Sequence, residues 1–191
     1  MANRVFSYSH VGLLKNLLRD FEDVKFNIFY LLSFLMLKII YLHGLESEQG
    51  GAKVEYLSAS HYVYAPAINY YDPNLLGQIV FSIETFKPDV IIGSSMGGYF
   101  ANELSIKFNT SAILLNPALL APPVRLNLND TEIRLSNRII VTVLGKRDTV
   151  LPYQATLDFL KKSNHCRVEM REYGHRTPFE EFIDICEKYL K

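Results

Sequence analysis

A serine stands between two glycines directly after a run of β-branched residues. The run 90–92 (VII) leads into residues 93–97 (GSSMG), a G-x-S-x-G motif with Ser95 at its centre. At a tight turn from a strand into a helix, glycine avoids collisions with the returning backbone, and the serine hydroxyl is exposed as a nucleophile. A glycine turn of this kind can also bind phosphate, which is the main alternative. No Lys-Ser or Lys-Thr pair follows Gly98, so a P-loop is excluded.

A serine nucleophile needs a base to accept its proton and an acid to orient that base, and candidates for both follow in the chain. Asp148 comes just after the apolar stretch 138–144, and His175 follows the predicted strand 167–173. The order serine, acid, histidine is that of the α/β-hydrolases. All three residues lie at ends of predicted strands, on the edge where open α/β sheets build their sites. We therefore expect Ser95, Asp148 and His175 to form a catalytic triad.

Each partner of the serine also has a less specific interpretation. Asp148 could cap the helix expected from residue 153, and His175 could be a loop histidine without a partner. The other histidines are His10, His43, His61 and His165. His10 lies far upstream of the fold, and we expect His61 and His165 to be structural or solvated. The order of all three candidates at strand ends favours the triad over these alternatives.

A predicted strand that ends in His-Gly supplies the fourth part of the expected site. Acyl transfer needs backbone N–H donors aimed at the charge that develops on the carbonyl oxygen. In α/β-hydrolases the residue after the nucleophile gives one donor, and the loop after such a strand gives another. We assign this oxyanion hole to the N–H groups of Leu45 and Met96. Gly44 would allow close approach, and His43 would shape the loop and not act as a base.

Together these motifs resemble the YqiA/YcfP group of small bacterial esterases, within the α/β-hydrolase superfamily. The resemblance is carried by YLHG at 41–44, GSSMGGY at 93–99, LNPA at 115–118, GKRD at 145–148 and GH at 174–175. It runs from about Ile39 to the C-terminus. It implies a carboxylester hydrolase with Ser95, Asp148 and His175 at the catalytic positions, acting on short-chain acyl esters or thioesters. The chain departs from the group in its upstream extension and in a shorter region 116–138.

The segment after the predicted strand 111–115 is expected to shape the substrate pocket. Residues 116–123 (NPALLAPP) carry apolar side chains, and only residues 116–137 separate that strand from the next. This length is too short for a large helical lid, so we expect an open, shallow site for small or flexible acyl groups. The pocket candidates are His43, Gly44, Asn116, Pro117 and Leu119. Alternatively, the leucines only cover the sheet. Arg125 could contact an anionic leaving group or be solvated.

Predicted strands and helices alternate along the chain. The strands are expected at 38–43, 61–65, 89–94, 111–115, 138–144 and 167–173. The helices are expected at 47–58, 73–86, 96–107, 153–163 and 178–190. This alternation predicts βαβ units with right-handed crossovers. The expected class is α/β: an α/β-hydrolase fold with a mostly parallel sheet of about six strands, helices on both faces and a minimal lid or none.

The composition fits a single soluble enzyme domain at residues 38–191. The chain has 191 residues, 49% of them hydrophobic, and a formal net charge of zero, so it can bury a sizeable core. The absence of a basic stripe argues against nucleic-acid binding. Cys166 and Cys186 lack metal-ligand spacing, and free thiols favour a reducing, cytoplasmic location. We expect no cofactor or metal and a small-molecule acyl ester or thioester as partner; the oligomeric state is left open.

Residues 1–37 form an extension whose role the sequence leaves open. Residues 11–24 have helical periodicity, and residues 26–37 form an apolar run shorter than the ~20 residues of a membrane span. Neither the basic flank nor the cleavage site of a signal peptide is clean. We favour an extra strand or helix packed on the sheet over a peripheral membrane anchor through residues 26–37. A third interpretation is that the natural protein begins at Met36.

Two other functions compete with ester hydrolysis. A thioesterase or an acyltransferase would use the same triad, and the sequence does not separate them. A non-catalytic α/β-hydrolase scaffold used for binding is the rival from another class, because fold alone does not fix function. The presence of Ser95, Asp148 and His175 together with the oxyanion loop argues against such a scaffold.

Overall fold

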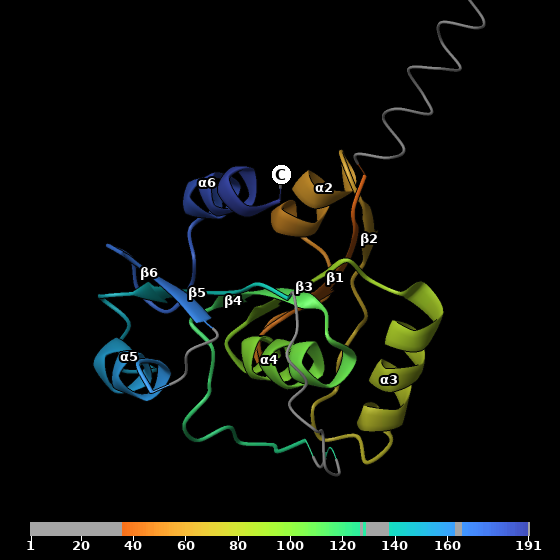
Figure 1. The fold of residues 1–191 in the computed structure, drawn as a ribbon, viewed down its shortest axis with the longest axis horizontal. Coiled ribbons are helices and arrows are strands. Elements are labelled where there is room, and N and C mark those ends of the chain that lie inside the picture. Colours follow the sequence, from red (N-terminus) through yellow and green to blue (C-terminus); the bar gives the residue numbers. More distant parts are fainter. Residues whose placement is uncertain (1–35, 127, 129–137, 163–165, 191) are drawn as a thin grey trace, which may run out of the picture. The chain divides into compact units, whose positions relative to one another are not determined.

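A single parallel sheet forms the centre of the computed structural model, which describes residues 36–126, 128, 138–162 and 166–190 (Figure 1). Within these residues the strands are β1 (Lys38–Leu42), β2 (Tyr62–Tyr64), β3 (Val90–Ser94), β4 (Ser111–Leu115), β5 (Ile140–Gly145) and β6 (Cys166–Arg171). Their order in the sheet is β2-β1-β3-β4-β5-β6, and every neighbouring pair is parallel. The carboxyl ends of all strands therefore meet at one edge.

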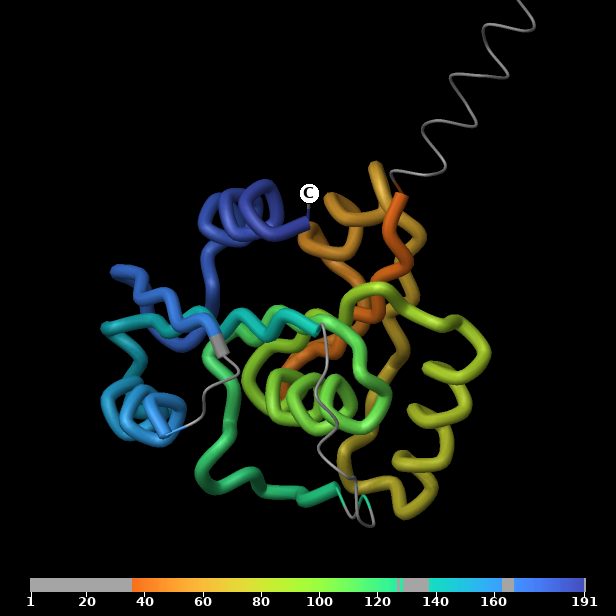
Figure 2. The backbone as a smooth tube through the Cα atoms, in the orientation of Figure 1, coloured from red at the N-terminus to blue at the C-terminus, as the bar shows by residue number. Residues whose placement is uncertain are grey.

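Helices cover both faces of this sheet. Within the described residues they are α2 (Ala52–Ser58), α3 (Leu75–Phe86), α4 (Met96–Phe108), α5 (Tyr153–Leu160) and α6 (Phe179–Tyr189). Helices α2 and α6 lie on one face, and α3, α4 and α5 lie on the other (Figure 1). Although far apart in the sequence, α2 and α6 lie side by side (Figure 2). The predicted α/β class, a parallel sheet of six strands with helices on both faces, is confirmed in the described residues.

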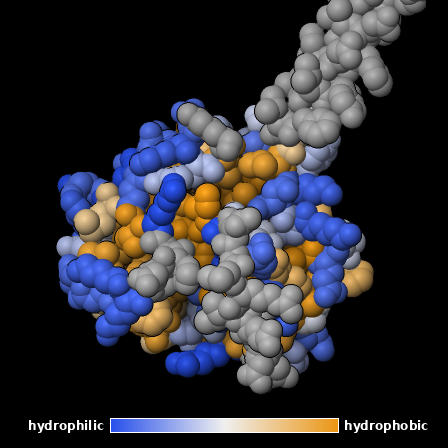
Figure 3. All heavy atoms as spheres, viewed as in Figure 1, coloured by the Kyte–Doolittle hydropathy of each residue, from blue (hydrophilic) through white to orange (hydrophobic). Residues whose placement is uncertain are grey.

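The apolar strands form two cores because successive side chains point to opposite faces of the sheet. Ile40 and Ile91 pack toward α4, where Phe100 is fully buried. Ile39 and Ile92 pack on the other face with Phe182 of α6. Burial on both faces explains why these strands are continuous apolar runs in the sequence. Figure 3 shows hydrophilic side chains around the rim of one face, with apolar side chains visible between them.

The predicted elements are all present, with small differences in their ends. The helix expected at 47–58 begins only at Ala52, because Gly50 and Gly51 adopt φ angles of 90° and 83° that a helix does not allow. The helix expected at 153–163 ends at Leu160. The interpretations of residues 11–24 and 26–35 lie outside the described residues, and a single domain at 38–191 stays a prediction.

None of the helices in the described part of the chain is long and apolar enough to cross a membrane.

Candidate active site

The turn from β3 into α4 holds Ser95 in a backbone conformation that is rare for serine. Its φ is 53° and its ψ is −113°, a geometry that costs about 1–3 kcal/mol and persists only where the surroundings impose it. A Cβ at Gly93 would lie 2.1 Å from the carbonyl oxygen of Gly97, and a Cβ at Gly97 would lie 2.1 Å from that of Leu42. Both positions therefore require glycine. The Ser95 N–H donates to the Leu115 carbonyl at 2.9 Å, which fixes the turn on β4.

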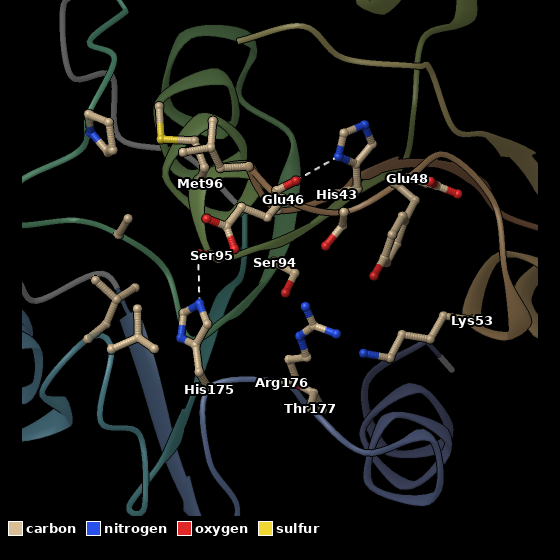
Figure 4. Close-up of a pocket in the computed structure, with 18 of the residues that line it drawn as sticks. His43, Glu46, Glu48, Lys53, Ser94, Ser95, Met96, His175, Arg176 and Thr177 are labelled. Atoms are coloured by element: carbon tan, nitrogen blue, oxygen red, sulfur yellow. Dashed lines mark hydrogen bonds between the residues drawn. The ribbon is translucent and has the colours of Figure 1, made fainter.

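The structure brings the three predicted triad side chains into one hydrogen-bonded chain. Ser95 Oγ lies 3.0 Å from His175 Nε2 (Figure 4), and His175 Nδ1 lies 2.8 Å from Asp148 Oδ2. Ser95 follows β3, Asp148 follows β5 and His175 follows β6, so the parallel sheet delivers all three to the same edge. These distances are within the range for proton transfer between hydroxyl and imidazole.

The Asp148 carboxylate is fixed by its own loop. Its side chain is 1% exposed, whereas the His175 side chain is 21% exposed. Oδ1 accepts hydrogen bonds from the N–H groups of Val150 and Leu151, both at 2.8 Å, and Oδ2 is left to His175. Asp148 is thus an Asx-turn residue, and the helix-capping alternative does not hold because Pro152 is the N-cap of α5 and no side chain caps that helix.

Asn116 joins the loops that carry the site. Its side-chain amide nitrogen donates to the carbonyl oxygens of Gly174 at 3.0 Å and His175 at 2.8 Å, and its side-chain oxygen accepts from Gly145 N–H at 2.6 Å. The residue is 2% exposed and has a φ of 43°. Asn116 therefore holds the ends of β4 and β5 and the histidine loop together, and it is a positioning residue.

Replacing Asn116 by alanine is expected to lower the free energy of unfolding by about 2–4 kcal/mol, since buried groups lose their partners. We also expect kcat of ester hydrolysis to fall more than KM changes, because the histidine backbone is no longer held. Denaturant unfolding and steady-state kinetics measure both effects. Asn109→Ala is the matched control: exposed Asn109 has a φ of 53° and no hydrogen bond from its side chain among the described residues. Equal losses in the two variants would contradict the role.

The residues assigned to the oxyanion hole lie beside the nucleophile. Leu45 and Met96 both line the cleft around Ser95. Met96 is the first residue of α4, where backbone N–H groups have no partner within the helix. A Cβ at Gly44 would lie 3.4 Å from the Ser95 Cβ, so the loop after β1 runs next to the serine.

His43 connects loops and is not placed to act as a base. Its Nε2 accepts a hydrogen bond from the Ile68 N–H at 3.1 Å, so the ring proton sits on Nδ1 and is donated to the Gly44 carbonyl at 2.7 Å. His43 is buried, and its backbone carbonyl accepts a hydrogen bond from the Tyr70 hydroxyl. His43 therefore shapes the loop as expected from the sequence, while both ring nitrogens are already used.

The triad opens into a cleft of about 820 Å³. Of the five residues predicted to form the pocket, His43 and Gly44 line this cleft, whereas Asn116, Pro117 and Leu119 lie elsewhere. The Asn116 side chain points to the loops behind the triad. Pro117 packs closely on Gly98: a Cβ added at Gly98 would lie 2.8 Å from the Cβ of Pro117. Leu119 packs against the apolar core. The same segment instead contributes Ala118, Ala121 and Pro123 to the cleft.

Four charged side chains in the cleft were not predicted. They are Glu46, Glu48, Lys53 and Arg176 (Figure 4). The sequence gives a sign of only one of them, because Arg176 directly follows His175 and is therefore close to the site. Arg125, which we considered as an anion contact, lines a different hollow with Tyr71 and Phe100.

Within the described residues, no group of three or more His, Cys, Asp or Glu side chains is arranged to hold a metal ion. Cys186 is a buried free thiol in the second core, and burial raises its pKa to about 12. The side chain of Cys166 lies outside what the structure describes.

Solved structures with the same architecture belong to the α/β-hydrolases. Mouse alpha/beta hydrolase domain-containing protein 10 is 18% identical over 81% of this chain and 90% of its own, with a TM-score of 0.58. The esterase Pf2001 of Pyrococcus furiosus is 13% identical over 81% and 84%, with a TM-score of 0.59. Est1E of Butyrivibrio proteoclasticus, with ferulic acid bound, is 14% identical over 80% and 86%, with a TM-score of 0.57. These similarities define the fold of the chain as that of the α/β-hydrolase superfamily.

A family model also matches part of the sequence. The model of an uncharacterised protein family (UPF0227) matches residues 38–131, which confirms the resemblance to the YqiA/YcfP-like family within the α/β-hydrolase superfamily. No curated protein matches the chain in sequence.

Proposed function

We propose that the protein is a serine hydrolase that cleaves carboxylic esters, or acyl thioesters, of small or flexible acyl groups. The observation that carries the proposal is the continuous set of hydrogen bonds from Ser95 through His175 to Asp148, at the wall of an open cleft. Nucleophile and base lie within hydrogen-bond reach, and a third group orients the base, which is the arrangement expected of an activated serine.

The first half of the reaction forms an acyl-enzyme. The Nδ1–H of His175 donates a hydrogen bond to the Asp148 carboxylate, so Nε2 carries the lone pair that accepts the Ser95 proton. Ser95 Oγ attacks the carbonyl carbon, and the N–H groups of Leu45 and Met96 stabilise the negative oxygen. His175 then protonates the departing alcohol or thiol as its bond to the acyl carbon breaks.

The second half repeats these steps with water. Water loses a proton to His175 Nε2 and attacks the acyl-enzyme, the oxyanion forms again, and the Ser95–acyl bond breaks as the imidazolium returns the proton to Ser95 Oγ. The acid leaves through the cleft.

A fluorophosphonate probe tests the proposal directly, because it reacts with serine only where a base and an oxyanion hole activate it. The native protein is expected to form a single adduct, located at Ser95 by peptide mass spectrometry, and to hydrolyse 4-nitrophenyl butyrate. Ser82→Ala on α3 is the control and should label like the native protein. An adduct at another serine, or no adduct and no hydrolysis, would contradict the proposal.

A further inference from the structure

Three side chains that can donate hydrogen bonds line the active-site cleft. They are Tyr41 of β1, Lys53 of α2 and Arg176 of the histidine loop, and they share the cleft with Ser95. The ends of Lys53 and Arg176 point into the space below Ser94 in Figure 4, whereas Glu46 and Glu48 are drawn on the other side of Ser94. The cleft is neutral in sum, but its cations and its carboxylates are separated.

None of these three donors has an acceptor among the described residues. Among the described residues, no hydrogen bond or ion pair involves the Tyr41 hydroxyl, the Lys53 ammonium or the Arg176 guanidinium. Several other cations of the described residues are paired: Arg171, for example, contacts Glu169, Glu181 and Asp184. Lys53 and Arg176 instead bring two unpaired cations to the cleft that holds Ser95.

The Tyr41 side chain is built into the wall of the cleft. The residue is 7% exposed, and its ring packs edge-on against Phe182 with a centroid distance of 6.2 Å. Burial raises the pKa of its hydroxyl to about 12, so the group remains a proton donor at neutral pH. The hydroxyl is not among the buried unpaired polar atoms of the described residues, so a ligand in the cleft can accept its hydrogen bond.

The Lys53 ammonium is held in place but not neutralised. It lies 5.5 Å from the centroid of the Phe182 ring, a cation–π contact between α2 and α6. Burial lowers the pKa of this ammonium, which is the effect of partial removal from water without a counter-ion. A bound anion would stabilise the charged ammonium and so offset the cost of its partial burial. The contact with Phe182 keeps the charge ready at the wall of the cleft.

We propose that Tyr41, Lys53 and Arg176 bind an anionic group of the substrate, so that the preferred esters or thioesters carry a carboxylate or a phosphate besides the scissile carbonyl. This inference rests on the proposed function and names its substrate class. The planar guanidinium matches two oxygens of such a group, and the ammonium and the hydroxyl supply further donors. The anion can belong to the acyl part or to the leaving group, since both present the same oxygens.

Two matched substrate pairs distinguish these sources. In the first pair, the 4-nitrophenyl monoester of adipic acid is compared with 4-nitrophenyl hexanoate, in which a methyl group replaces the acyl carboxylate. In the second pair, butyryl-coenzyme A is compared with butyryl-N-acetylcysteamine, which lacks the phosphates of the leaving group. For one of the pairs, the native protein is expected to show a kcat/KM about 100-fold higher for the anionic member.

Charge-removing variants link that preference to the site. Arg176→Gln and Lys53→Gln are each expected to lower the ratio of the two kcat/KM values about tenfold, which corresponds to the loss of one charge-assisted hydrogen bond. Tyr41→Phe keeps the ring packing and should lower the ratio by a smaller factor. Lys162→Gln, after α5, removes the same charge at an exposed position and should leave the ratio at the native value.

The outcomes separate this inference from the proposed function. Hydrolysis of the neutral esters with no preference in either pair overturns the anion site and leaves the hydrolase standing. If no ester is cleaved, calorimetry of adipate binding to Ser95→Ala tests the site without catalysis. Adipate binding that disappears on the further substitution Arg176→Gln supports the anion site, whereas the absence of adipate binding overturns it.

Discussion

Replacing Ser95 by alanine is expected to lower kcat for 4-nitrophenyl butyrate by about 10⁴- to 10⁶-fold. The alanine variant retains the cleft and the oxyanion donors, but it has no oxygen to attack the carbonyl carbon. The expected effect on stability is small. Among the described residues the hydroxyl forms a hydrogen bond only with His175 Nε2, at 3.0 Å, and alanine meets the same strain at a φ of 53°. The free energy of unfolding should change by less than about 1 kcal/mol.

Stopped assays of the variant and denaturant unfolding on the same preparation measure the two effects together. Ser82→Ala provides the baseline for loss of a serine hydroxyl elsewhere. Residual turnover within about tenfold of the native protein would show that another group attacks the ester, and the proposed mechanism would then be wrong. A large loss of stability in Ser95→Ala would show that the turn depends on the hydroxyl. We do not expect this, because the backbone N–H of Ser95 holds the turn through its hydrogen bond to Leu115.

The fold could be predicted from the sequence because the four strands β1, β3, β4 and β5 are buried on both faces. Runs such as 39–42 and 90–92 are continuously apolar, and a polar residue or glycine ends them. The triad residues could be predicted for the same reason. Ser95 and Asp148 come soon after such runs, His175 follows the edge strand β6, and parallel strands bring their ends together regardless of the distance along the chain.

The rest of the site depends on contacts that no local pattern encodes. Asn116 looked like a pocket residue from its place after a strand, but its amide reaches residues 58 and 59 positions away. Lys53 is an ordinary residue in the sequence of a short helix, and it lines the cleft only because α2 packs beside α6. The start of α2 was missed because glycine propensity is weak evidence until the φ angles at 50 and 51 are known.

Asp148→Asn is expected to lower kcat about 10⁴-fold, because it forces the wrong tautomer on the histidine. Oδ1 of Asp148 accepts two backbone N–H groups, from Val150 and Leu151. The oxygen of the asparagine must stay there, so its NH₂ group faces His175 Nδ1. Nδ1 then has to accept, the ring proton moves to Nε2, and Nε2 can no longer take the Ser95 proton. Steady-state hydrolysis and the rate of fluorophosphonate labelling should fall together.

A second variant separates this effect from the structural role of the carboxylate. Asp148→Ala removes the acceptor of both loop N–H groups and should lower the free energy of unfolding by about 2–4 kcal/mol, whereas Asp148→Asn keeps those bonds and should lose less. Asp158→Asn on exposed α5 controls for the charge change. If Asp148→Asn stays within tenfold of native kcat while Ser95→Ala is inactive, another group orients His175. If both Asp148 variants lose equal stability, the loop is not held through Oδ1, and the tautomer argument loses its basis.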